Sequence, residues 1–281
     1  MKKILVIFLV ILSLYLLFTN LDRIPWLPFG KSEDSVKITD KIDKINIDIS
    51  TVSTKVIPEK ISEVRAQLKG KGEVNVSRNG DTIEVEYKRG FFDWFPFTKT
   101  SNLTIFVPED YDKDMELRIG SGHLEFISSS MKLNNLSAEV QSGNLKLHHL
   151  TVREFNHNVA SGNSTIKSLS TQEGEFEIHS GNVNLEGYSG KLDVDISSGR
   201  LKAQIAELTD AISIEVNSGL LDLDLPNDAD FTLNGKENSG FISSDFTLTN
   251  STSESNKLQG VHGSGTHEIN VEVNSGKVDI Y

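Results

Sequence analysis

The dipeptide Ser-Gly returns at nearly constant intervals along the second half of the chain, and this repeat constrains the fold more than any other feature. The spacing is 18 to 21 residues over seven pairs, which end at Gly122, Gly143, Gly162, Gly181, Gly199, Gly219 and Gly240. An eighth pair ends at Gly276, 36 residues further on, or about two periods. A period near 20 residues is typical of a solenoid, in which each repeat forms one coil.

Apolar residues keep a fixed distance from these glycines. The column three residues before the glycine contains Ile119, Val140, Val159, Ile178, Ile196, Val216 and Val273. Similar columns lie five residues before the glycine and two and four residues after it, and the residues between them are mostly polar. Apolar residues two apart predict strands with one buried face. We therefore predict an all-β fold, a single-stranded β-solenoid over residues 119–281 with about 18–21 residues per coil.

The Ser-Gly pair falls between two such strands, so it is the predicted corner of each coil. Glycine is expected there because it adopts backbone conformations that a Cβ atom forbids, and serine can hydrogen-bond to nearby backbone. The pairs Ser189-Gly190 and Ser264-Gly265 fall out of phase. The Gly240 unit also departs from the pattern, so we expect a disturbed coil followed by a polar surface loop near residues 249–265.

Residues 36–118 alternate in the same way but without a clean repeat. "KINIDI", "EVNVS", "TIEVEY" and "NLTIFVP" predict strands, and "RNGD" between the second and third of these predicts a hairpin turn. We expect this region to be a β-rich cap that covers the membrane-proximal end of the solenoid, whose edge would otherwise be open.

The N-terminus predicts a membrane anchor. Lys2 and Lys3 precede an apolar run that reaches 18 residues by Leu21, just long enough to span a bilayer. A cleaved signal peptide is the alternative, but no small-residue cleavage site follows the run. We expect residues 1–21 to be an uncleaved single-pass anchor in the cell membrane, with the lysines cytoplasmic and the rest of the chain extracytoplasmic. Residues 22–35 are the expected juxtamembrane tether.

The segments around the Ser-Gly pairs resemble those of a known family. The segments "VQSGNLKL", "VASGNSTI", "IHSGNVNL" and "VNSGLLDL" resemble the bacterial "putative adhesin" family with β-strand repeats, a domain of unknown function. With its anchor and the tether motif "IPW", the whole chain is similar to LiaG-type membrane-anchored proteins, which accompany the Lia cell-envelope stress system of Gram-positive bacteria. The resemblance implies a β-repeat fold at the cell envelope and brings no catalytic residues.

Composition and motifs give little support to an enzymatic, metal-binding or nucleic-acid-binding function. The formal net charge of −12 disfavours nucleic-acid binding, and the absence of cysteine excludes disulfides and thiolate metal sites. Asp193 and Asp195 precede one corner whereas Asp222 and Asp224 follow the next, so we expect solvated carboxylates rather than a ladder. The histidines fall at different distances from the corners, and His157 occupies an apolar column, so we expect a core histidine. No nucleotide motif occurs, and we expect no cofactor and no metal.

One segment stands out from this background. Residues 88–100 read "KRGFFDWFPFTKT" and combine five aromatic residues with basic neighbours. The candidate contact residues are Lys88, Arg89, Phe91, Phe92, Trp94, Phe95 and Phe97. They predict either a hydrophobic plug over the end of the solenoid or a loop that contacts the outer leaflet or a membrane partner, because aromatic and basic side chains favour that interface.

We therefore expect a non-enzymatic, membrane-anchored extracytoplasmic solenoid of the cell envelope, which binds a surface component or supports an envelope-stress response. Its expected partners are the cytoplasmic membrane, other membrane proteins of the stress system, and a cell-wall or surface polymer. Two alternatives stay open: an enzyme that acts on a polysaccharide, and an adhesin or structural spacer. A carboxylate cluster in a groove favours the enzyme, whereas a featureless solenoid with an exposed aromatic loop favours the binding protein.

Overall fold

A computed structural model describes residues 30–89, 101–128, 131–254 and 256–281 of the chain. The predicted anchor and most of the aromatic segment lie outside these residues. The described residues form 22 β-strands and no helix, so none of them forms a helix long and apolar enough to cross a membrane. The expectation of an all-β fold is confirmed.

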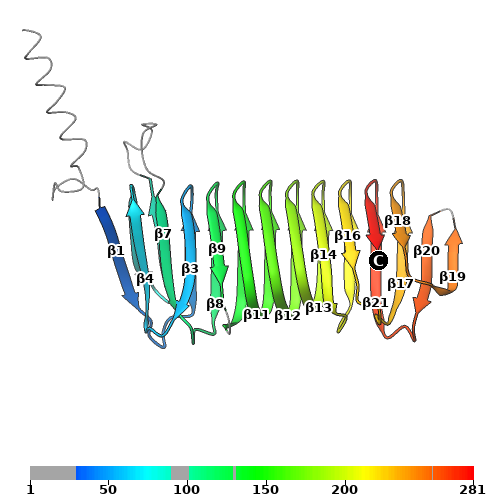
Figure 1. The fold of residues 1–281 in the computed structure, drawn as a ribbon, viewed down its shortest axis with the longest axis horizontal. Coiled ribbons are helices and arrows are strands. Elements are labelled where there is room, and N and C mark those ends of the chain that lie inside the picture. Colours follow the sequence, from blue (N-terminus) through cyan, green and yellow to red (C-terminus); the bar gives the residue numbers. More distant parts are fainter. Residues whose placement is uncertain (1–29, 90–100, 129–130, 255) are drawn as a thin grey trace, which may run out of the picture.

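The strands lie side by side in a long row of stacked coils (Figure 1), and each coil contributes one strand to each of two layers. We call the layer whose strands lead into the Ser-Gly corner layer 1. In spatial order it contains β5 (Glu73–Asn79), β6 (Thr82–Lys88), β2 (Lys44–Ile49), β8 (Asp114–Ile119), β10 (Lys132–Val140), the second halves of β11 (Asn144–Val159), β12 (Asn163–Ile178) and β13 (Asn182–Ile196), then β15 (Ile212–Val216), β21 (His267–Val273), β17 (Phe231–Glu237), β20 (Lys257–His262) and β19 (Thr249–Glu254).

Layer 2 is formed by the strands that leave the corner. In the same order it contains β1 (Gly30–Lys37), β4 (Glu63–Gly70), β7 (Asn102–Pro108), β3 (Ser53–Glu59), β9 (His123–Ile127), the first halves of β11, β12 and β13, then β14 (Arg200–Glu207), β16 (Leu220–Asp224), β22 (Lys277–Ile280) and β18 (Phe241–Ser244). The two layers join into one sheet because β11, β12 and β13 run through a second bend. There His149 (φ 57°), Ser168 (φ 55°) and Gly187 (φ 70°) stack in left-handed conformations.

The apolar columns form the core between the layers, as predicted. Every residue of the column three before the corner glycine that the sequence analysis names is buried, and so is every residue two after it. In the column four after the glycine, Ser244 of the end coil is only partly buried. His157 is 1% exposed and its Nδ1 lies 2.9 Å from the Ala138 carbonyl oxygen, so the expectation of a core histidine is confirmed.

The corner glycines are required for a different reason from the one predicted. None of the in-phase glycines has a positive φ; a Cβ on Gly181 would lie 2.6 Å from the carbonyl oxygen of Gly162 in the preceding coil and would also strike Val159. The corners therefore need glycine because successive backbones approach too closely for a side chain. The out-of-phase Gly190 (φ 124°) and Gly265 (φ 80°) are the ones that need its conformational freedom.

Coils do not stack in sequence order at the C-terminal end. β21 pairs with β15 on one side and β17 on the other, and β22 lies between β16 and β18, so the last coil of the chain is inserted between two earlier ones. Figure 1 shows the C-terminus within the row rather than at its end. Most of the segment predicted as a polar loop near residues 249–265 instead forms the antiparallel strands β19 and β20, and β20 pairs with β17.

The N-terminal region is also built of coils. β2 and β3 flank a corner at residues 50–52, and this coil lies between the β6–β7 coil and the β8–β9 coil. The "RNGD" turn joins β5 and β6 as predicted. β1 begins at Gly30 and pairs along β4, so the second half of the predicted tether is strand.

Candidate functional site

The outer face of layer 1 carries a dense group of carboxylates over β12, β13, β15 and β21. Alternate residues of these strands point away from the core, and they line a shallow groove with neighbouring residues of β17. We call the six acidic residues of this groove the acidic face: Glu175, Glu177, Asp193, Asp195, Glu215 and Glu272. All six are exposed or half-buried, so they present negative charge to solvent.

Four of these carboxylates form a ladder across neighbouring strands. Glu177 is paired in register with Asp195, Asp195 with Glu215, and Glu215 with Glu272. Adjacent strands lie about 4.8 Å apart, so the four charges follow one another at that spacing. As expected, Asp193 and Asp195 do not form a ladder with Asp222 and Asp224, because the first two lie on β13 in layer 1 and the last two on β16 in layer 2. The ladder that the structure shows instead joins Asp195 to glutamates at the matching position of other coils, which the sequence analysis did not compare.

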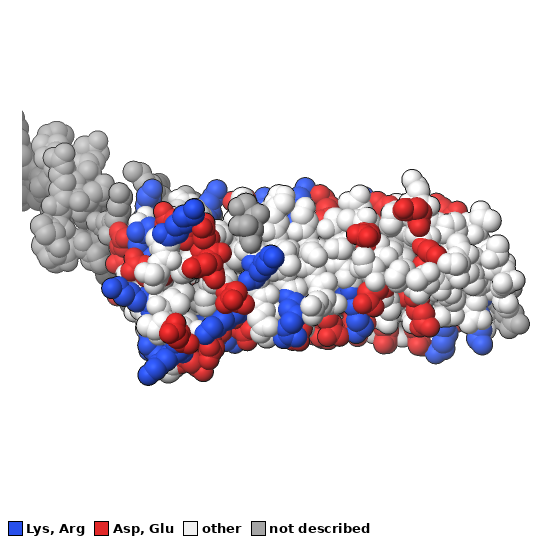
Figure 2. All heavy atoms as spheres, turned by 90° about the horizontal axis from the view of Figure 1, so that it is seen from below, with Lys and Arg blue, Asp and Glu red and all other residues white. Residues whose placement is uncertain are grey.

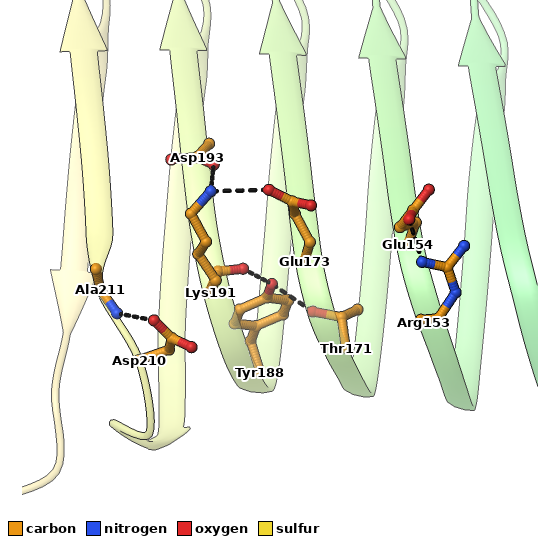
Figure 3. Close-up of polar contacts among 9 residues, drawn as sticks. All are labelled: Arg153, Glu154, Thr171, Glu173, Tyr188, Lys191, Asp193, Asp210 and Ala211. Atoms are coloured by element: carbon orange, nitrogen blue, oxygen red, sulfur yellow. Dashed lines mark hydrogen bonds and ion pairs between the residues drawn. The ribbon is translucent and has the colours of Figure 1, made fainter.

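Lysine side chains neutralise carboxylates at the rims of the acidic face more than at its centre. At one rim Lys191 Nζ lies 2.8 Å from both Asp193 and Glu173 (Figure 3), and hydrogen bonds to Asp193 and then to Glu173 raise the pKa of that lysine. At the other rim Lys236 Nζ lies 2.6 Å from Glu272. Among the described residues, Asp195 and Glu215 between these rims form no ion pair, so the middle of the ladder is the least compensated part of the face.

A buried tyrosine supports the strand that carries Lys191 and Asp193. The Tyr188 ring is fully buried, and its hydroxyl donates to the Lys191 carbonyl oxygen at 2.5 Å and lies 2.7 Å from Thr171 Oγ1 (Figure 3). Burial raises the pKa of Tyr188 to about 12, so it stays a neutral donor. Gly174 leaves room for this hydroxyl, because a Cβ there would collide with it. The out-of-phase Gly190 also lies close to β12 here, because a Cβ on it would collide with the Thr171 carbonyl oxygen.

The other surfaces of the rod differ in charge. On the outer face of layer 2, cations lie beside many of the carboxylates, as in the ion pairs Lys167–Glu186 at 2.8 Å and Lys55–Glu125 at 3.1 Å. Figure 2 looks onto the edge opposite the Ser-Gly corners, where charged side chains crowd the β1–β9 end and uncharged residues prevail along the middle coils. Net negative charge is therefore concentrated on one broad face.

The structure places two of the predicted contact residues. Lys88 and Arg89 are exposed at the end of β6, and the Lys88 ammonium lies 3.2 Å from Glu86. Phe91, Phe92, Trp94, Phe95 and Phe97 lie outside the described residues. The described strands on either side of them are β6, which ends at Lys88, and β7, which begins at Asn102.

The histidines are dispersed in the described part of the chain. His148 and His149 lie side by side with ring centroids 6.4 Å apart, but no group of three or more His, Asp or Glu residues in this part is placed to hold a metal ion. Burial lowers the pKa of His157 to about 4, against the opposing effect of its hydrogen bond to Ala138, so it is neutral at physiological pH.

A two-layered β-solenoid that displays polar side chains on long outer faces is a repeat scaffold, whose coils build an extended surface rather than a single deep pocket. The chain belongs to the Toastrack family, DUF4097, whose profile matches residues 42–281. No curated protein matches this sequence.

Several solved bacterial structures are similar over most of their length. A "putative adhesin" from Bacteroides fragilis is 14% identical, with 89% of this chain and 97% of that chain covered and a TM-score of 0.49. A "putative lipid binding protein" from Parabacteroides distasonis is 13% identical, with 89% and 96% covered and a TM-score of 0.48. A "putative cell adhesion protein" from Clostridium sporogenes is 12% identical, with 89% and 98% covered and a TM-score of 0.31.

Proposed function

We propose that this protein is a non-enzymatic binding protein of the bacterial cell envelope, held at the membrane by residues 1–21 with its solenoid outside. The observation that carries the proposal is the ladder Glu177–Asp195–Glu215–Glu272 on the outer face of layer 1. Regularly spaced carboxylates on a flat, solvated face suit an extended partner with amino or guanidinium groups, such as a basic peptide or an amine-bearing surface polymer.

The arrangement of the N-terminal coils supports membrane attachment at one end of the rod. β1 begins at Gly30, only eight residues after Asp22, and lies at the edge of layer 2. An extended segment of eight residues spans at most about 29 Å, so the anchor would hold this end near the bilayer. The strands β6 and β7, which precede and follow the aromatic residues in the chain, belong to the same end. This supports the proposal that Lys88, Arg89 and the five aromatic residues contact the outer leaflet or a membrane partner.

The role in an envelope-stress response is proposed from the resemblance to LiaG-type proteins. A negatively charged face outside the membrane could capture cationic agents that attack the envelope, or dock a basic region of a membrane protein of the stress system. Both roles use the same surface, and neither requires chemistry by the solenoid.

Binding of a cationic probe by the full chain tests this proposal. We expect a fluorescent decalysine peptide to bind the chain in zwitterionic nanodiscs, and its affinity to fall steeply as salt rises, because exposed charges are screened. The double variant Asp195→Asn/Glu215→Gln should weaken binding about tenfold. The matched control Asp222→Asn/Asp224→Asn changes the charge equally on layer 2 and should change it less than about twofold. Equal losses in both variants would contradict the proposal.

A polysaccharide-acting enzyme is the second candidate, because the ladder brings carboxylates into a groove. Neighbouring and next-neighbouring strands place carboxyl groups about 5 and 10 Å apart, which brackets the separations that glycosidases use. A glycosidase also needs one carboxyl group in surroundings that keep it protonated, such as an apolar pocket. Asp195 and Glu215 are both exposed, which favours binding over hydrolysis. Release of new reducing ends from purified cell-wall polysaccharide, lost in Glu215→Gln, would favour the enzyme instead.

A further inference from the structure

The two ends of the solenoid are the places where its sheet could add a strand from another molecule. In the described part of the chain, four strands have a partner on one side only: β1 pairs with β4 and β5 with β6 at the N-terminal end, and β18 pairs with β22 and β19 with β20 at the C-terminal end. Every other strand of layer 2 between β4 and β18 has a partner on both sides. Exposed strand edges invite edge-to-edge association, so a stable solenoid must close them.

At the C-terminal end, a carboxylate occupies the open edge of β18. The amides of Phe241 and Asp245 point toward β22 and donate to Gly276 and Ile280, so the intervening Ile242 amide points outward. That amide donates to Glu237 Oε1 at 2.5 Å. A strand added to this edge would need the Ile242 amide as a hydrogen-bond donor. Its backbone would also lie against the negative charge of Glu237.

Glu237 is also the exception in its column. It lies three residues before its corner glycine, and the same position in the other Ser-Gly coils is always a buried Ile or Val. A valine at 237 would match the column but could not accept a hydrogen bond. The end coil therefore gives up an apolar core residue and gains a side chain that reaches its own open edge.

A second carboxylate has the same role at the N-terminal end. Asp34 of β1 accepts from the Val76 amide of β5 through Oδ2 at 2.7 Å and from the Ser35 amide through Oδ1 at 2.9 Å. Val76 belongs to the terminal strand of layer 1, and β1 is the terminal strand of layer 2. One side chain thus joins the two sheet edges that meet at this end.

We infer that Asp34 and Glu237 are edge caps, which close the β5 edge at the N-terminal end and the β18 edge at the C-terminal end to strand addition by a second copy of this chain. Partners must then use the faces of the rod rather than these two capped edges. This inference does not depend on the cationic ligand proposed above.

The association state of the full chain in detergent tests the inference. Wild type should sediment as a single copy with its micelle, whereas Glu237→Val should form dimers as concentration rises, because the β18 edge of each copy is then no longer capped. Adding Asp34→Ala should open the second edge and produce species larger than dimers. Glu237→Gln keeps an acceptor oxygen and should stay a single copy, as should Lys236→Val, which adds the same apolar side chain one residue away on the exposed face.

Hydrogen exchange provides a test that does not depend on association. In Glu237→Ala, exchange of the Ile242 amide should be about tenfold to a hundredfold faster than in wild type, as expected when a hydrogen bond to a charged group is lost. If Glu237→Val fails to fold, this measurement decides. A folded Glu237→Val that remains a single copy, or unchanged exchange at Ile242 in Glu237→Ala, would overturn the inference.

Discussion

Asn274 donates its side-chain amide to Asn217 Oδ1 at 2.8 Å, although 57 residues separate them in the chain. On its other side it accepts from Asn238 at 2.5 Å. The three asparagines occupy the same corner position of three coils, so this ladder records the insertion of the C-terminal coil between two coils that precede it. The same insertion places Glu272 beside Glu215 and so completes the acidic ladder.

Substitution of a corner glycine should lower stability more than substitution of a glycine that has a positive φ but has room around it for a Cβ atom. In Gly181→Ala the new Cβ strikes backbone atoms of the neighbouring coil, which cannot retreat, so we expect a loss of about 3 kcal/mol or more. Gly80 has φ 64°, and a Cβ on this residue would meet no atom within 4 Å, so Gly80→Ala should cost about 1 kcal/mol. Urea unfolding of both variants measures the difference, and a larger loss at Gly80 would contradict the close-packing explanation.

This contrast also shows what the sequence could and could not predict. Alternation around Ser-Gly identified the buried columns, because burial follows directly from a two-residue period on strands. The same pattern could not distinguish a glycine needed for φ from one needed for close approach, since both depend on contacts between coils. Gly181 and Gly190 look alike in sequence, yet only Gly190 has a positive φ.

The stacking order of the coils could not be predicted from the sequence, for a similar reason. Each coil presents the same apolar columns to either neighbour, so the column containing Val216 and Val273 fits several stacking orders. The acidic ladder, by contrast, had a sequence signal that went unused: Glu177, Asp195, Glu215 and Glu272 each lie four residues before a corner glycine. A comparison of that polar column, rather than of neighbouring aspartates, would have predicted the ladder.

Protonation of His157 should make the fold acid-sensitive between about pH 6.5 and 4. Burial lowers the folded-state pKa to about 4, below the ordinary value of 6.5, so the unfolded chain binds the proton first. Stability from this residue is therefore complete above pH 6.5 and falls as the pH drops toward 4, by up to about 3 kcal/mol. In His157→Leu this part of the pH dependence of urea unfolding should disappear, whereas the exposed His179→Gln should retain it. An unchanged profile in His157→Leu would argue against a buried neutral histidine.

The turn that leads into the last coil should depend on Asp230. Its carboxylate accepts from the amides of Gly265 and Thr266 and from the hydroxyls of Ser264 and Thr266. Those hydrogen bonds, that of Ser264 first, lower the pKa of Asp230 below its usual value of 3.8. The stabilisation is thus present above that pH and is lost as the pH falls toward the lower folded-state value.

Limited proteolysis measures this effect. Asp230→Ala should be cut faster within residues 258–267 than wild type at neutral pH, while the exposed Asp228→Ala in the same connection should not. Equal cutting of Asp230→Ala and wild type would mean that the turn is held by other contacts.

Disulfide crosslinking of Glu215 to Glu272 tests the central structural claim, that β15 and β21 are neighbours, most directly. The natural chain contains no cysteine, so only the introduced cysteines can react. Paired residues of adjacent strands lie within the Cα separation that a disulfide requires. We predict that Glu215→Cys/Glu272→Cys forms an internal disulfide under mild oxidation, and that Glu215→Cys/Lys236→Cys does not, because Glu272 separates those two positions in the ladder. Crosslinking of the second pair but not the first would show that the coils stack in sequence order, and would contradict both the inserted C-terminal coil and the acidic face that it completes.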